Sequence, residues 1–84
     1  MITQEKLKIF KHYSGDLNAL RQTNSTEKDT ITAHDWFVIG NLLQDIMLVS
    51  KGLASEAYAV RVWEELKHAC ADQETVDELK KMAE

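Results

Sequence analysis

The most constraining feature of this sequence is a long apolar segment in the middle of an acidic chain. Residues 34–52, HDWFVIGNLLQDIMLVSKG, contain few polar side chains. When the segment is wound as an α-helix, its apolar residues cover an arc of roughly 200°, whereas an ordinary surface helix has an apolar arc of about 100°. The segment therefore predicts a central helix that must be covered on more than one side.

Composition indicates that the rest of the chain is helical too. There is no Pro and there are only three Gly among 84 residues, and helix-favouring residues dominate. A chain of this length supports one hydrophobic core, so we expect a single helical domain over residues 1–84. The single cysteine cannot close an internal disulfide and no zinc-site spacing is present, so the core or a partner must supply the stability.

The first predicted helix begins near Thr3, and its apolar stripe stays in phase across Ser14-Gly15-Asp16. Phase continuity favours one helix to about residue 22, kinked at Gly15. The alternative is a break, in which Gly15 ends the first helix and Asp16 caps a short second one. Residues 23–31, TNSTEKDTI, are predicted to form a loop because their Thr, Asn and Ser side chains compete for backbone hydrogen bonds.

Capping signals delimit the remaining helices. Thr32 and Asp35 have capping-box spacing before a helix over residues 33–50, which ends at Lys51-Gly52. A third helix opens at Leu53 or Ser55 and runs to about residue 70. A short fourth begins at Asp72 or Thr75, where Thr75 and Glu78 have capping-box spacing. Short connections favour antiparallel neighbours, so the fold class is all-α, an up-down bundle of three long helices plus a short C-terminal fourth.

The surplus apolar surface of the helix over residues 33–50 has two interpretations. In one, the other helices cover it completely. In the other, part of it contacts another protein, and a second copy of the chain is the commonest partner of that kind. We favour the second interpretation and predict a protein–protein interaction or regulatory module that forms a homodimer, with Trp36, Phe37 and Leu48 as contact residues.

Residues that could carry chemistry are few and scattered. Glu65 and His68 have a metal-ligand spacing, but di-iron helical bundles need two such motifs and two further carboxylates. His12, His34 and His68 fall on three different predicted helices, and Cys70 lies on an apolar face, which is typical of a buried structural thiol. No Gly-rich phosphate loop or nucleophile elbow is present. We therefore expect no enzyme activity, no cofactor and no metal.

The charge of the chain bears on other classes of partner. The formal net charge is −4, which argues against binding to nucleic acid or to an anionic membrane surface. The alternative to a protein partner is a DNA-binding regulator, because the second and third predicted helices resemble a helix-turn-helix in outline. Polar residues interrupt the apolar segment and no signal peptide is visible, so we expect no membrane span and a cytoplasmic location.

Overall fold

A computed structural model describes all 84 residues, and it confirms that the chain is all-α. The helices are α1 (Gln4–His12), α2 (Leu17–Arg21), α3 (Glu27–Thr30), α4 (Ala33–Ser50), α5 (Glu56–Ala69) and α6 (Gln73–Met82). Only α4 and α5 are longer than ten residues. The expected count of three long helices and a short fourth does not describe this set of six.

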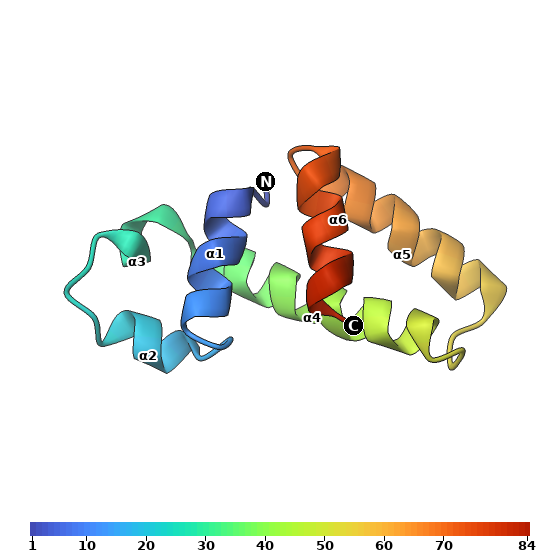
Figure 1. Cartoon of the computed structure of the whole chain (residues 1–84), viewed down its shortest axis with the longest axis horizontal. Helices are drawn as coiled ribbons and strands as arrows, with labels where there is room; N and C mark the ends of the chain where they lie inside the picture. Colours follow the sequence, from blue (N-terminus) through green and yellow to red (C-terminus); the bar gives the residue numbers. More distant parts are fainter.

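The helices are arranged around α4 and do not form a simple up-down bundle. Figure 1 shows α1 and α6 side by side, both crossing α4, while α5 returns from the C-terminal end of α4. The short helices α2 and α3 lie at the opposite end, beside α1. The molecule is accordingly elongated, with principal extents of 43 × 22 × 19 Å.

A non-local backbone pairing explains why α1 and α6 run in the same direction. Ile2 and Cys70, which precede the two helices, form an isolated parallel bridge. The Ile2 amide donates to the Ala69 carbonyl, and the Ala71 amide donates to the Ile2 carbonyl, each at 2.8 Å. Because the bridge sets the starts of α1 and α6 side by side, the antiparallel rule for consecutive helices does not govern this pair.

Most of the predicted helix ends are confirmed. Thr32 and Asp35 form a complete capping box at α4, and Gly52 follows its C-cap residue with a left-handed φ of 71°. Ser55 caps α5 by accepting from the Tyr58 amide. Asp72 caps α6, so the alternative start at Thr75 is wrong: Thr75 lies inside the helix and its amide donates to Asp72.

The expectation of one helix through Gly15 is wrong, and the alternative is correct. Ser14 and Gly15 both have left-handed backbones, with φ of 52° and 74°, which ends α1. Asp16 then caps α2 by accepting from the amides of residues 18 and 19. The indole Nε1 of Trp36 donates to the Gly15 carbonyl at 3.1 Å, so the break is tied directly to α4. Within the predicted loop over residues 23–31, residues 27–30 form the single helical turn of α3.

The core lies where α1, α5 and α6 meet α4. Its fully buried side chains include Leu7 of α1, Ile39 and Ile46 of α4, Leu66 of α5 and Leu79 of α6. An ion pair of 3.0 Å between Lys6 Nζ and Asp35 Oδ2 joins α1 to the start of α4. None of the helices combines the length and the apolar character that crossing a membrane requires.

Candidate functional site

One side of α4 has no helix packed against it, and we call the residues there the open strip. At 100° per residue these positions fall on one side of the helix, opposite the buried Ile39 and Ile46. All six are exposed or partly exposed, and none carries a charge. The open strip consists of Phe37, Gly40, Asn41, Gln44, Met47 and Leu48.

Two large apolar side chains of the open strip are in solvent. Phe37 is 61% exposed and Met47 is 40% exposed, although both belong to the most apolar segment of the chain. Burying a phenylalanine side chain contributes about 1.5–3 kcal/mol, and this chain does not gain that contribution at Phe37. Leu48, which lies three turns along the helix from Phe37, is half-buried.

Gly40 is another unexpected residue on the open strip, in addition to the exposed Phe37 and Met47. It lies in the middle of α4 with a helical backbone, and a Cβ placed there would have no neighbour within 4 Å. Gly in a helix interior costs roughly 0.5–1 kcal/mol relative to Ala. Neither the backbone conformation nor the packing of the chain requires the absence of a side chain at this position.

The three predicted contact residues have different surroundings. Trp36 is only 3% exposed, with its ring centroid 4.7 Å from that of Phe10, so it is a core residue and is not retained as a contact residue. Phe37 is exposed and Leu48 is partly exposed, and both lie on the open strip. Sequence reasoning did not select Gly40 or Met47, although an isolated Gly in the middle of an apolar helix was a visible signal.

A groove of about 440 Å³ lies beside the open strip, between α4 and α5. Its floor is apolar, formed by Val38, Leu42 and Ala69. Its rim is polar, and the sequence did not indicate this site because the rim residues come from two helices. The rim residues are Asn41, Asp45, Glu65 and His68.

The α5 side of this groove is joined to α4 by a short hydrogen bond. The Tyr58 hydroxyl donates to Asp45 Oδ1 at 2.6 Å. That hydrogen bond, followed by burial and by the negative charges of Asp45 and Glu65, raises the pKa of the Tyr58 hydroxyl above its usual value. Tyr58 therefore remains protonated at neutral pH and holds the Asp45 carboxylate at the groove.

The residues that could carry chemistry do not converge. His12, His34 and His68 lie on α1, α4 and α5, and all three are exposed. Cys70 is buried, as predicted, and burial together with the nearby Asp72 raises the pKa of its thiol to about 11. No three His, Cys, Asp or Glu side chains are grouped closely enough to hold a metal ion.

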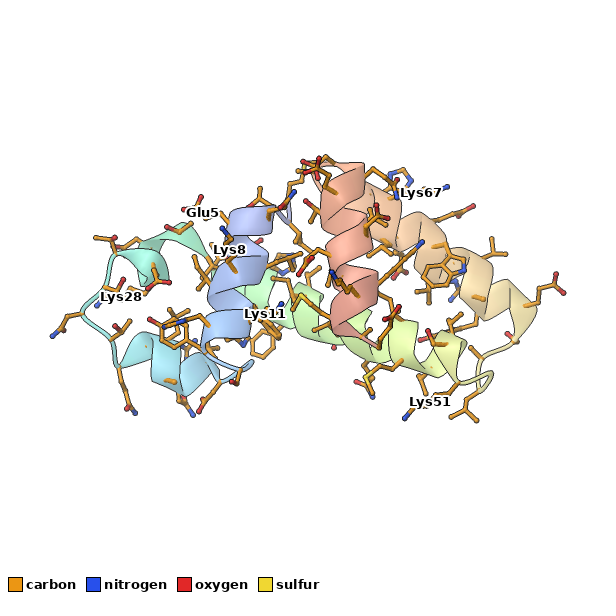
Figure 2. All side chains as sticks on the ribbon, viewed as in Figure 1. Glu5, Lys8, Lys11, Lys28, Lys51 and Lys67 are labelled. Carbon is orange, nitrogen blue, oxygen red and sulfur yellow. The ribbon has the colours of Figure 1, made fainter.

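The lysines are distributed over the whole length of the molecule. Figure 2 shows Lys28 at the α3 end, Lys8 and Lys11 along α1, Lys51 at the C-terminal end of α4, and Lys67 near the corner between α5 and α6. These labelled lysines do not gather at one place on the molecule.

Comparisons with protein-family models, curated proteins and solved structures found no match to this chain.

Proposed function

We propose that this chain is a non-catalytic protein–protein interaction module that associates with a second copy of itself through the open strip. The observation that carries the proposal is Phe37, which is 61% exposed on a helix whose opposite side forms the core. Large exposed apolar side chains that lie together on a soluble domain are typical of contact surfaces. Gly40 supports the same conclusion, because a Gly without a role inside the chain permits another backbone to approach closely.

The absence of charge on the open strip is compatible with a second copy of this acidic chain as the partner. Each copy has a net charge of −4, so two copies repel each other overall, and a contact surface without charge avoids adding close like-charge pairs to that repulsion. The open strip is the uncharged side of α4, between His34 and Lys51. No pair of opposite charges is needed across this contact, because burial of apolar side chains supplies the attraction between the two copies.

A second copy also fits the open strip in shape. The strip has an aromatic residue at one end and aliphatic residues at the other. An antiparallel crossing of two α4 helices therefore places Phe37 of each copy against Met47 and Leu48 of the other. Symmetric contacts of this kind are the rule in homodimers. The midpoint of this crossing falls at about residue 42, so Gly40 lies roughly half a turn from the centre, inside the contact.

The test is mass in solution by light scattering over a hundredfold range of concentration, for the native protein, Phe37→Asp and Val60→Asp. Val60 is the matched control because it is 53% exposed on α5, outside the open strip. We expect a native dimer, a folded monomer for Phe37→Asp, and an unchanged dimer for Val60→Asp. A native protein that stays monomeric at every concentration contradicts the proposal, and so does equal dissociation by both substitutions.

The DNA-binding alternative has no structural observation in its favour. The exposed residues that open α5 include Glu56, and Glu64 and Glu65 follow on the same helix. Carboxylates at these positions repel phosphates, and the lysines labelled in Figure 2 are spread along the molecule and not gathered beside them. We therefore do not propose it.

A further inference from the structure

The groove between α4 and α5 combines an apolar floor with a negatively charged rim. Val38, Leu42 and Ala69 form the floor, while Asp45 and Glu65 stand on opposite helices at the rim. The chain has two ion pairs, Lys6–Asp35 and Lys11–Glu78, and neither involves a carboxylate of the groove. The groove therefore offers two carboxylates that form no ion pair within the chain, although the positive charge of Arg61 lies near enough to Tyr58 to act on its pKa.

From this complementarity we infer that the groove binds the arginine side chain of a partner protein, flanked in that partner by an aliphatic residue. The three methylenes of arginine can lie on the apolar floor while the guanidinium group reaches the rim. Its planar array of five donors can serve several acceptors at once, here the carboxylates of Asp45 and Glu65 and the amide oxygen of Asn41.

The rim residues favour an arginine side chain over a metal ion or a lysine side chain. A metal ion needs several ligands within its first coordination sphere, and the carboxylates and His68 of the groove do not form such a group. A lysine ammonium is a compact, strongly hydrated charge, whereas a guanidinium spans separated acceptors and loses less hydration. The volume of about 440 Å³ also exceeds what a bare ion would fill.

The geometry of one rim carboxylate is already fixed in the free protein. The Tyr58 hydroxyl donates to Asp45 Oδ1, so the side chain of Asp45 is held by α5 before any ligand arrives. Pre-organisation of this kind reduces the entropy lost on binding. This site shares Asn41 with the open strip, but its other residues lie on α5 or on the side of α4 that faces α5.

The probe for this site is the dipeptide N-acetyl-Leu-Arg-amide, titrated into ¹⁵N-labelled protein to about 20 mM and followed by NMR chemical shifts. N-acetyl-Leu-citrulline-amide is the matched ligand control, because citrulline has the same shape without the charge. We expect shifts centred on Asn41, Asp45 and Glu65 for the arginine peptide, and binding at least about tenfold weaker for the citrulline peptide.

Paired protein variants locate the site. Asp45→Asn/Glu65→Gln should weaken binding of the arginine peptide about tenfold, since Asn retains an acceptor for Tyr58 but both charges are lost. Glu64→Gln removes a charge from the exposed residue adjacent to Glu65 and should leave the affinity unchanged. Repeating the titration on Phe37→Asp separates this site from the dimer contact, because the affinity should persist whether or not the protein self-associates.

Three results would overturn the inference. The first is no localised shift at the highest peptide concentration. The second is equal binding of the arginine and citrulline peptides. The third is the same loss of affinity in Glu64→Gln as in the double variant, which would mean that the peptide responds to overall charge and not to the groove.

Discussion

Gly15 and Gly52 both have left-handed backbones, but only Gly15 is in close contact with a neighbouring side chain. A Cβ at Gly15 would lie 3.3 Å from Cζ of Phe10, whereas one at Gly52 would have no neighbour within 4 Å. Gly52→Ala should therefore lower the free energy of unfolding by about 1–2 kcal/mol through backbone strain alone. Gly15→Ala should lower it further, because Phe10 packs on Trp36 and cannot move freely.

Urea unfolding of the two variants measures the difference between them. Equal losses of stability would show that Phe10 gives way at no cost and that the two positions are equivalent.

Asp35 makes the stability of the protein depend on pH. Burial alone would raise the pKa of its carboxyl group, but hydrogen bonds from Lys6 and Thr32 outweigh burial and lower it below the usual value. A lowered pKa in the folded state means that the carboxylate stabilises the fold above the unfolded-state pKa of about 3.9. That contribution is lost as the pH falls through the folded-state pKa.

Asp35→Asn should consequently be less stable than the native protein by about 1–3 kcal/mol at pH 7, since a charge-assisted hydrogen bond to Lys6 is weakened. The difference in the free energy of unfolding between the two proteins should become smaller below a pH of about 3.9. Urea unfolding of both proteins at several pH values measures it. A gap that stays constant down to strongly acidic pH would show that the charge of Asp35 does not contribute.

Single residues differ in how far the sequence reveals their role. Thr32 and Asp35 were predictable as a capping pair because the hydrogen bonds are local and need only the right spacing. The role of Trp36 was not predictable, because a wide apolar arc does not tell which of its members faces a neighbouring helix. The bond from its indole to the Gly15 carbonyl joins positions 21 residues apart.

At the scale of the elements, the break after α1 shows the limit of an argument from periodicity. The apolar stripe continues in phase from α1 to α2 because both helices contribute buried residues, Phe10 and Leu20 among them, to one core. Phase alone therefore cannot distinguish one helix from two. The local signals, a Gly followed by a capping Asp16, indicated the break correctly.

The bridge at the start of α1 and α6 can be tested through its central side chain. Ile2 is 1% exposed, and its backbone makes both bridging hydrogen bonds. Ile2→Ala should lower the free energy of unfolding by about 2–5 kcal/mol, as expected for a large apolar side chain removed from a core. Met1→Ala is the control, because the Met1 side chain is 71% exposed and should contribute almost nothing.

Thermal or urea unfolding followed by circular dichroism measures both changes. A loss below about 1 kcal/mol for Ile2→Ala would mean that the start of the chain is not an integral part of the core.

At the scale of the whole molecule, the arrangement of helices depends on contacts that no local pattern encodes. Short connections correctly place α5 back along α4, but α1 and α6 are neighbours only through the pairing of Ile2 with Cys70. This arrangement leaves the open strip of α4 uncovered, because the crossing helices occupy the other side. The surplus apolar surface of the central segment was visible in the sequence, and the specific residues that remain exposed were not.

Gly40 gives opposite predictions for folding and for association. Gly40→Ala and Gly40→Leu should each raise the free energy of unfolding of the monomer by about 0.5–1 kcal/mol, because both residues favour helices and the position is open. In the proposed dimer, where Gly40 lies inside the contact, the same side chains would force the two α4 helices apart. The dissociation constant should rise about tenfold for Ala, since extra methyl groups in a packed contact cost about 1–3 kcal/mol, and further for Leu.

Unfolding at high dilution measures the effect on the monomer, and sedimentation over a range of concentration measures the effect on association. The two variants keep the charge of the native protein, so any weakening reports the shape of the contact. Unchanged association of Gly40→Leu would place Gly40 outside the contact. Tighter association would show that the contact has room for a side chain there, and either result contradicts a close approach at Gly40. A graded loss from Ala to Leu, in chains that fold more stably than the native one, would place Gly40 inside the packed contact between the two copies.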